Sequence, residues 1–438
     1  MRRYHVTTFG CQMNVHDSER IKGLLEGAGL GEAADRDEAD VLVFNTCTIR
    51  EKADDRLVQH LHDARGRKER DPDLQIVVAG CWAESQREEI FREYPWVDAA
   101  VGPGRIGSLG DVMRAEGAER GAFGSFDDFA ADLPRRRERD FQAWLQLSMG
   151  CNSVCSYCIV PSVRGRERSR HPREVLAEAR QLAAEGVVEV MLLGQNVNSY
   201  GRDLPPDERC TFAEMLRAVD AIDGIGRIRF MSPHPKDMRG DVISAMAESE
   251  AVCHQLHLPL QSGSTRVLKR MRRTYDQGRY LDLVGRLREA MPDIALTTDV
   301  IVGFPGETDG DFEDTLDVYE QVGFDHAFTF IYSPRRGTEA AGFEDQVPDA
   351  VKHERLERLV DVVQGHAARR NAALVGTTQE VLSEGPSRTD PDVFRGKTRG
   401  NKTALFTPAA PAGSVVSMVV EESTSQTLRG RILSPVPA

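Results

Sequence analysis

Three closely spaced cysteines, Cys151, Cys155 and Cys158, are the residues of this sequence best suited to metal chemistry. They come directly after a predicted strand and enter a predicted loop, where three thiolates can surround one metal centre. Structural zinc sites close four ligand positions, and no fourth Cys or His lies near these residues in the sequence. Short runs of cysteine also hold four-iron clusters, with one thiolate on each iron. Three cysteines would leave one iron open to a substrate; a zinc site with a distant fourth ligand is the alternative.

Cys11, Cys47 and Cys81 form a second candidate site, although they are far apart along the chain. Each follows a predicted parallel strand by one or two residues. The carboxyl ends of parallel strands share one edge of a sheet, so the three side chains can converge there. A predicted helix follows each cysteine, and a helix N-terminus favours the thiolate form. The pattern indicates a second three-thiolate metal site; the alternative is three buried cysteines that act as small apolar residues.

Residues 1–118 predict an α/β domain with a parallel sheet. Continuous apolar runs are typical of strands that are buried on both faces, and a helical segment follows each of the long ones. Alternation of strands and helices gives this layered structure. The predicted strands are Tyr4–Phe9, Val41–Asn45 and Leu74–Ala79, and the predicted helices are Asp17–Gly27, Arg50–Lys68 and Glu84–Glu93.

Residues 119–136 predict a linker, because Gly, Asp and Arg interrupt the alternating pattern there. Residues 137–370 contain six strand–helix units, fewer than the eight units of a complete barrel of about 250 residues. An open six-strand (β/α)6 partial barrel or a doubly wound sheet remains, and both place their chemistry at the carboxyl ends of the strands. The predicted strands are Ala143–Met149, Val187–Gly194, Arg227–Ser232, His254–Leu260, Ala295–Gly303 and His326–Tyr332, and the predicted helices include Pro172–Glu185, Asp237–Glu248, Tyr280–Met291 and Asp309–Val322.

A long charged helix, Val347–Leu374, is predicted to cross the central domain before the pattern changes. Residues 371–438 contain short β-rich runs separated by turn residues. Roughly 60 residues of this kind predict a small closed all-β barrel of the oligonucleotide-binding (OB-like) type. The predicted strands are Gln379–Ser383, Ala404–Thr407, Ser414–Val420 and Leu428–Leu433.

The 438 residues include 56 Lys and Arg and 69 Asp and Glu, so the formal charge of −13 argues against broad coating of DNA. No apolar window approaches the roughly 18 residues of a membrane span, and no apolar signal region begins the chain. Because the eight cysteines suit metal binding better than disulfides, we expect a cytoplasmic protein without membrane contact. Basic residues nevertheless cluster in ways that an RNA backbone would use. The clusters are Arg164–Arg173, Arg266–Arg273, Arg335–Arg336 and Arg395–Lys402.

The Cys-x3-Cys-x2-Cys loop resembles the radical S-adenosylmethionine superfamily, in which the open iron binds the amino and carboxylate groups of S-adenosylmethionine. Several other segments resemble the methylthiotransferases, and within them the branch that modifies isopentenylated adenosine, the tRNA-2-methylthio-N6-dimethylallyladenosine synthases. The resemblance covers nearly the whole chain and is specific up to residue 370. It is weaker at the end of the chain, which resembles the RNA-binding TRAM domain mainly by position and β-rich texture. The segments are Thr8–Asn14, Asn45–Arg50, Gly80–Cys81, Leu193–Tyr200, His257–Ser264, Asp299–Glu307 and Tyr332–Thr338.

The resemblance implies addition of a methylthio group to C2 of N6-(dimethylallyl)adenosine beside the tRNA anticodon. Its cofactors would be two 4Fe-4S clusters and two molecules of S-adenosylmethionine, one as methyl donor and one as source of a 5′-deoxyadenosyl radical. Cys151, Cys155 and Cys158 would hold the radical cluster, which makes them the catalytic trio. Cys11, Cys47 and Cys81 would hold the second, auxiliary cluster, which would carry the sulfur. The expected partners are the isopentenylated tRNA, an electron donor such as flavodoxin or ferredoxin and a sulfur source, and a monomer is the expected state.

Polar residues at three barrel-strand ends are the candidate cofactor-binding residues. The second strand ends where the superfamily binds the methionine amino group, the fourth where ribose or substrate would lie, and the fifth where a Gly-rich turn can approach the adenine. Gly and Asn also favour ordinary turns, so a plain strand-to-helix turn is the alternative for the first position. The candidates are Gln195, Asn196, Gln261, Ser262, Asp299 and Gly303.

Two other functions compete with this assignment. Methylthiotransferases of related branches would act on threonylcarbamoyladenosine in tRNA or on an aspartate of a ribosomal protein. A non-catalytic iron–sulfur or electron-transfer protein with an RNA-binding tail belongs to a different class. Incomplete coordination argues against a carrier, because an electron carrier normally closes all ligand positions of its cluster.

Overall fold

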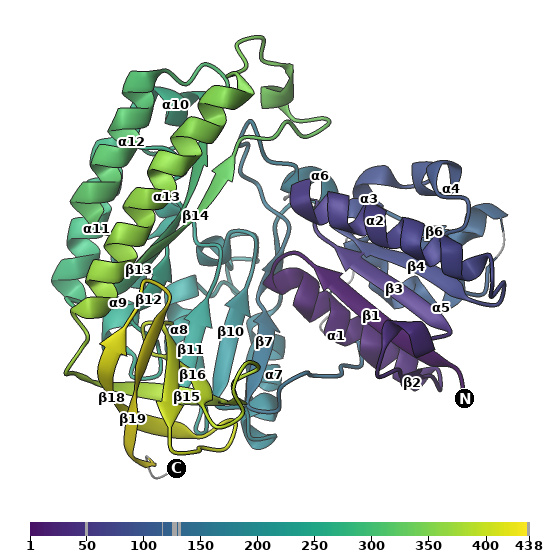
Figure 1. Ribbon diagram of the computed structural model, residues 1–438, viewed down its shortest axis with the longest axis horizontal. Helices are drawn as coiled ribbons and strands as arrows, with labels where there is room; N and C mark the ends of the chain where they lie inside the picture. Colours follow the sequence, from purple (N-terminus) through teal and green to yellow (C-terminus); the bar gives the residue numbers. More distant parts are fainter. Residues whose placement is uncertain (49–50, 116, 125–128, 130–132, 436–438) are drawn as a thin grey trace.

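The computed structural model describes residues 1–48, 51–115, 117–124, 129 and 133–435. Ile49 and Arg50, which end the segment Asn45–Arg50, lie outside the described residues, so the predicted start of the helix Arg50–Lys68 lies there too. Figure 1 shows an α/β domain at the N-terminus, a central curved sheet with helices on its outer side, and a small β-barrel at the C-terminus. The predicted α/β class with these three parts is confirmed.

The N-terminal sheet contains six parallel strands in the order β2-β1-β3-β4-β5-β6. Its three long strands agree with the predictions, and Phe9, Thr46 and Gly80 lie in register at their carboxyl ends. The outer strands have only two or three residues, too few to show a periodic pattern. The last of them lies within the segment 119–136 that the sequence assigns to a linker. The strands are β1 (Arg3–Phe9), β2 (Gly31–Glu32), β3 (Val41–Thr46), β4 (Gln75–Gly80), β5 (Ala99–Val101) and β6 (Gly121–Ala122).

Two helices of this domain differ from the predicted ones. Helix α1 begins at Gln12, five residues before the predicted start at Asp17, because Cys11 rather than an acidic residue is its N-cap. The predicted helix Glu84–Glu93 is two helices, since Arg87 has a φ of 50° and ends the first. The helices are α1 (Gln12–Gly27), α2 (Glu51–Lys68), α3 (Cys81–Gln86), α4 (Glu89–Glu93) and α5 (Leu109–Val112).

The central domain is the open six-strand barrel of the two alternatives. Two parallel three-stranded sheets, β11-β10-β7 and β12-β13-β14, are joined by one bridge between Ile228 and Val252. All six strands match predicted ones, although most are shorter. The strands are β7 (Gln142–Gln146), β10 (Glu189–Leu193), β11 (Arg227–Phe230), β12 (Gln255–His257), β13 (Ala295–Val302) and β14 (His326–Ile331). Two short antiparallel strands, β8 (Ser148–Met149) and β9 (Arg168–Ser169), pair beside the end of the first strand.

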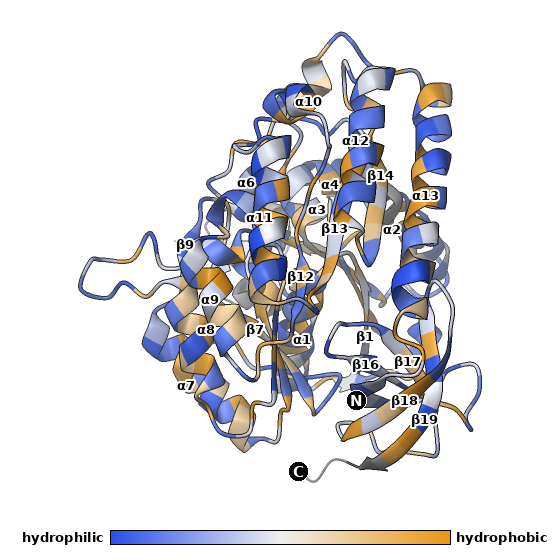
Figure 2. Cartoon of the chain, turned by 90° about the vertical axis from the view of Figure 1, so that its left-hand side faces the viewer, coloured by the Kyte–Doolittle hydropathy of each residue, from blue (hydrophilic) through white to orange (hydrophobic). Residues whose placement is uncertain are grey.

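Helices cover the outer face of this barrel and bury its core. Val190, Leu192 and Val300 point into that core, and Figure 2 shows hydrophobic and hydrophilic residues alternating along α13. None of the described helices has both the length and the apolar character needed to span a membrane. The helices are α6 (Val160–Arg164), α7 (Pro172–Ala184), α8 (Phe212–Asp220), α9 (Gly240–Glu248), α10 (Thr265–Arg270), α11 (Gln277–Ala290), α12 (Asp309–Val322) and α13 (Asp349–Ala372).

The C-terminal strands close a barrel in the order β15-β16-β17-β19-β18. Four of its strands match predicted ones; β16 falls in the run that the sequence assigns to a basic cluster. The barrel lies at the amino ends of the central strands, where Lys402 pairs with Asp325 and Gly400 approaches Ala295. The strands are β15 (Thr378–Pro386), β16 (Phe394–Thr398), β17 (Thr403–Thr407), β18 (Val415–Ser423) and β19 (Thr427–Pro435).

Candidate active site

Cys151, Cys155 and Cys158 lie in the loop between β8 and α6, at the carboxyl end of the central barrel. All three line a cavity of about 730 Å³. Burial raises the pKa of Cys151, and burial followed by the charge of Cys155 raises the pKa of Cys158 to about 12. The thiols of Cys151 and Cys158 therefore resist ionisation unless a cationic centre neutralises them. This donor set fits an iron cluster, because each iron binds one thiolate.

The loop is fastened to the segment that follows α10. Arg273 Nη1 donates a hydrogen bond to Cys155 Sγ at 3.3 Å. Ser156 Oγ donates to the carbonyl oxygen of Arg270 at 2.8 Å, and the ring of Tyr157 meets Phe304 edge-on with 6.4 Å between ring centroids. The described residues contain no group of three His, Cys, Asp or Glu side chains placed to hold a single metal ion.

Gln195 and Asn196 lie just after the end of β10. In each side chain, one polar atom is hydrogen-bonded and the other is not. Gly150 N–H donates to Gln195 Oε1, which connects Gln195 to the residue before Cys151. Asn196 Nδ2 donates to Asp237 Oδ2 at 2.8 Å. Gln195 Nε2 and Asn196 Oδ1 are buried and have no hydrogen-bond partner in the part of the chain that is described. Buried polar atoms are costly when unpaired, so both positions suit a polar ligand.

The other four candidates are placed differently. The carboxylate of Asp299 lies 3.3 Å from His257 Nε2, and Gln261 has a φ of 67° with its backbone N–H bonded to the carbonyl oxygen of Asp299. Ser262 is fully buried against Thr315, with 3.4 Å between their hydroxyl oxygens. A Cβ on Gly303 would lie 2.3 Å from Cγ of Lys352 in α13. Ser262 and Gly303 therefore contact packed helices. None of the six candidates is among the described residues that line the cavity of the three cysteines.

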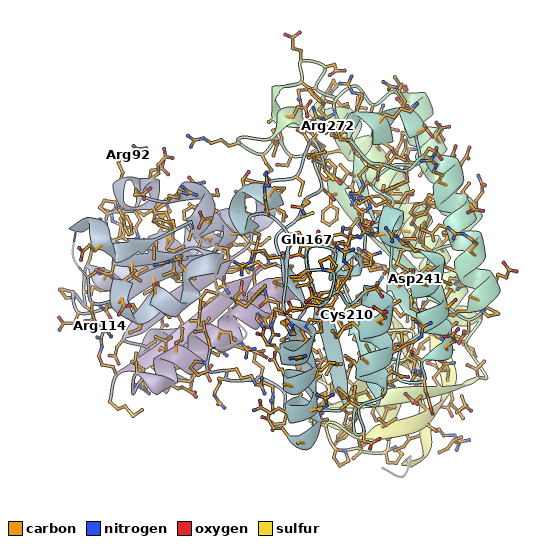
Figure 3. The ribbon with its side chains drawn as sticks, turned by 180° about the vertical axis from the view of Figure 1, so that it is seen from behind. Arg92, Arg114, Glu167, Cys210, Asp241 and Arg272 are labelled. Atoms are coloured by element: carbon orange, nitrogen blue, oxygen red, sulfur yellow. The ribbon has the colours of Figure 1, made fainter. Side chains whose placement is uncertain are left out.

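Glu167 is a cavity residue that the sequence reasoning missed. It is buried, and Ser199 Oγ donates to its Oε1 at 2.5 Å. Burial raises the pKa of its carboxyl group. Figure 3 shows Glu167 between the N-terminal domain and the central helices. The only signal was its position in the Arg-rich run after the cysteine loop, which was interpreted as a basic cluster.

The structure brings the N-terminal cysteines together at the edge of the sheet. A hydrogen bond from Cys47 and the charge of Arg164 lower the pKa of the Cys11 thiol to about 6. Gly10 and Gly80 make this approach possible, because a Cβ on Gly10 would lie 2.5 Å from Cβ of Cys47. Both glycines have positive φ, of 136° and 93°, which other residues rarely adopt.

Helix α6 connects the two cysteine sites. It begins two residues after Cys158. An apolar cluster joins Cys81 to Val163 of this helix and to Ile159, the residue just before it. Arg164 Nε donates to Cys81 Sγ at 3.2 Å. On the other side, Cys11 packs against Met191 and Leu193 of β10. The two trios therefore face the same end of the central barrel.

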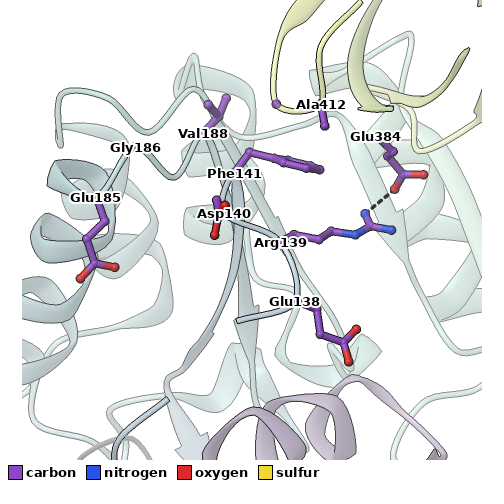
Figure 4. Close-up of a pocket in the computed structure, with 10 residues that line it drawn as sticks. Glu138, Arg139, Asp140, Phe141, Glu185, Gly186, Val188, Glu384 and Ala412 are labelled. Atoms are coloured by element: carbon purple, nitrogen blue, oxygen red, sulfur yellow. Dashed lines mark hydrogen bonds and ion pairs between the residues drawn. The ribbon is translucent and has the colours of Figure 1, made fainter. Parts of the chain in front are cut away.

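The basic residues of the Arg395–Lys402 cluster remain partly exposed and have partners within the protein. Lys402 pairs with Asp325 at 2.7 Å and Arg395 pairs with Glu384 at 2.8 Å, while Arg399 donates to the carbonyl oxygen of Val252. These cations pair with carboxylates or donate to a carbonyl oxygen at the junction with the central domain. Figure 4 shows the neighbouring pair of Arg139 and Glu384 at this junction.

Two family models match the chain. Residues 3–102 match the Uncharacterized protein family UPF0004, and residues 145–319 match the Radical SAM superfamily. Among solved structures, TsrM from Kitasatospora setae, a radical S-adenosylmethionine methyltransferase with cobalamin and a 4Fe-4S cluster bound, is 14% identical with a TM-score of 0.53. The match covers 78% of this chain and 77% of that chain, and it shows a shared fold.

Curated relatives are much more similar. The tRNA-2-methylthio-N(6)-dimethylallyladenosine synthase of Salinispora arenicola is 52% identical over 422 residues, which cover 94% of this chain and 84% of the relative. The protein of the same name from Thermobifida fusca is 50% identical over 413 residues, covering 92% and 83%. On this identity and coverage, the chain belongs to the family of tRNA-2-methylthio-N(6)-dimethylallyladenosine synthases, which are radical S-adenosylmethionine enzymes.

Proposed function

We propose that this protein adds a methylthio group to C2 of N6-(dimethylallyl)adenosine beside the anticodon of tRNA. The observation that carries the proposal is the joining of two cysteine trios by α6 at one end of the barrel. The names of the relatives support the substrate. Because the substrate is tRNA, we propose a cytoplasmic reaction.

The cysteines of the central domain would hold one 4Fe-4S cluster, and those of the N-terminal domain would hold a second. When bound, the first supplies an electron to S-adenosylmethionine for radical formation, and the second supplies the sulfur. The unpaired Gln195 Nε2 and Asn196 Oδ1 would orient S-adenosylmethionine beside the cavity, while Gln261 and Asp299 would bind its remainder or the substrate. Ser262 and Gly303 would support these contacts through packing.

The lumen of the barrel offers an aromatic wall for the substrate base. Along β14, alternate residues point to opposite faces; Ala327 packs in the core and Phe328 is 43% exposed. The rings of Phe328 and His257 lie 5.8 Å apart, and Asp299 is the register partner of Phe328. Aromatic rings of this kind stack on unpaired bases. An electron donor such as flavodoxin or ferredoxin and a sulfur source would complete the reaction, with the chain acting as a monomer.

The test is mass spectrometry of tRNA nucleosides from a deletion strain that carries the wild-type gene or a Cys151→Ala gene. We expect the methylthio-isopentenyl nucleoside with the wild type alone. Restoration of methylthio-threonylcarbamoyladenosine instead, or of a methylthiolated ribosomal protein, would reassign the substrate. Anaerobic incubation with dithionite and S-adenosylmethionine separates the enzyme from an electron carrier, since only the enzyme yields 5′-deoxyadenosine.

A further inference from the structure

Arg164 connects the loop of Cys151, Cys155 and Cys158 to the N-terminal domain through two of its three nitrogen atoms. Its side chain is 3% exposed and comes from the last residue of α6. Nε donates to Cys81 Sγ at 3.2 Å, and Nη2 donates to Asp17 Oδ2 at 2.7 Å. Nη1 is equally buried and has no hydrogen-bond partner among the residues that the structure describes.

An unpaired donor on a buried guanidinium is costly, because the group loses its hydration without replacing it. The carboxylate of Asp17 compensates the charge of Arg164 but uses only Nη2. Since Nε already contacts Cys81, the remaining donor belongs to a group that lies at the same thiolate site. The acceptor chemistry that fits there is an anionic sulfur.

We propose that Arg164 is a positioning residue for the auxiliary cluster, holding Cys81 in place, donating from Nη1 to a sulfur of that cluster and raising its reduction potential. The inference rests on the proposed function, which assigns the cluster to Cys11, Cys47 and Cys81. A fixed cation favours the reduced, more negative cluster through its charge. Arg164 follows Cys158 by six residues, so a residue of the central domain would contact the cluster that the N-terminal domain holds.

Two substitutions distinguish an electrostatic role from a purely structural one. Arg164→Gln and Asp17→Asn break the same ion pair but remove opposite charges. Both are made in the full chain with Cys151, Cys155 and Cys158 changed to Ala, so that only the auxiliary cluster contributes. The readout is the midpoint potential from a redox titration followed by electron paramagnetic resonance, with dithionite as reductant.

We expect shifts of opposite sign. Arg164→Gln should make one-electron reduction at least tenfold less favourable, a change of about 59 mV towards negative potential. Asp17→Asn should shift the potential in the positive direction. Equal shifts in one direction, or no shift in either variant, would overturn the inference, because both variants lose the same contact.

Further variants keep the test decisive. Arg164→Lys retains the charge and should keep the potential closer to the parent than Arg164→Gln does; a potential equal to that of the Gln variant counts against the role of charge. If Arg164→Gln retains no iron, the sign of the Asp17→Asn shift decides. Arg266→Gln, which breaks the distant pair with Asp311, is the matched control and should leave the potential unchanged. If the parent itself binds no iron or sulfide, the proposed auxiliary site fails and not merely the role of Arg164.

Discussion

The guanidinium of Arg273 lies 3.3 Å from the sulfur of Cys155 and 5.2 Å from the centre of the Tyr275 ring. Arg273 Nε also donates to the hydroxyl of Tyr275 at 3.1 Å, so the cation has a defined position beside the loop of Cys151, Cys155 and Cys158. Burial alone would lower the pKa of this guanidinium, but Tyr275, Tyr157 and then Cys155 raise the pKa well above its ordinary value, so the group stays protonated. The loop that carries three thiolates thus has a permanent cation against its middle cysteine.

Arg273→Gln should lower the yield of 5′-deoxyadenosine about tenfold or more, because a hydrogen bond to a charged group contributes about 1.5–3 kcal/mol. The measurement is product quantification under anaerobic conditions with dithionite. Arg279→Gln, at an exposed site on α11, is the control. An unchanged yield in the Arg273 variant would show that its contact with Cys155 has no functional weight.

Under the proposed function, which gives the two trios separate roles, replacing any one N-terminal cysteine should spare 5′-deoxyadenosine formation but abolish methylthio insertion. The variants are Cys11→Ala, Cys47→Ala and Cys81→Ala. Cys151→Ala, Cys155→Ala and Cys158→Ala should stop both. Chromatography of the nucleoside products and of 5′-deoxyadenosine in the same reactions gives both readouts. Methylthio product from a variant of the N-terminal trio would contradict the auxiliary role.

Gly80→Ala should remove roughly half of the iron, since one of the two proposed four-iron clusters would be lost. A Cβ there would lie 2.4 Å from Asn45 Oδ1 and 2.6 Å from the carbonyl oxygen of Thr46, at a φ of 93°. Gly66→Ala is the matched control, because its Cβ would meet no atom within 4 Å. Iron and sulfide analysis after anaerobic reconstitution checks this; equal iron in both variants would refute it.

Glu19→Gln should stabilise the protein at pH 8 but not at pH 4.5. Burial raises the pKa of Glu19 from 4.5 to about 7. The folded state therefore binds a proton that the unfolded state releases between these values, and the stability from that proton is lost as the pH rises through 7. The gain at pH 8 is at most about 3 kcal/mol. Thermal unfolding at both pH values measures it, with Glu69→Gln at an exposed site as control; equal effects at both pH values would contradict the burial of a shifted carboxyl.

Arg227→Met should loosen the C-terminal barrel from the central domain. The side chain is 1% exposed, and its Nη2 donates to Glu380 Oε1 at 2.8 Å while Nη1 donates to the carbonyl oxygen of Lys397. Because Glu380 is 37% exposed, the loss costs less than the about 3–5 kcal/mol of a fully buried ion pair. Limited proteolysis should release a fragment that begins near residue 371, whereas Arg217→Met at an exposed pair should leave the chain intact. Equal resistance of both variants to proteolysis would contradict this expectation.

The sequence predicted the long elements well because their cause is local. Buried parallel strands such as Val41–Thr46 are continuous apolar runs, and the cysteines that follow them converge for topological reasons. Strand β16 was missed because its basic side chains suggested solvent or RNA, whereas Arg395 pairs with Glu384 of the neighbouring strand β15. The roles of Arg164 and Glu167 depend on tertiary contacts that no spacing pattern records. The break at Arg87 likewise depends on a backbone conformation unusual for that residue type.

The C-terminal barrel lies at the amino ends of the central strands, and the cysteine loop lies at their carboxyl ends. The eight residues of β13 span roughly 26 Å at about 3.3 Å per residue. Ion pairs between Lys402 and Asp325 and between Arg227 and Glu380 hold the barrel at this end. An RNA that contacts the barrel and also enters the cavity must therefore span this distance. The length of the strands thus sets the length of RNA that can do both.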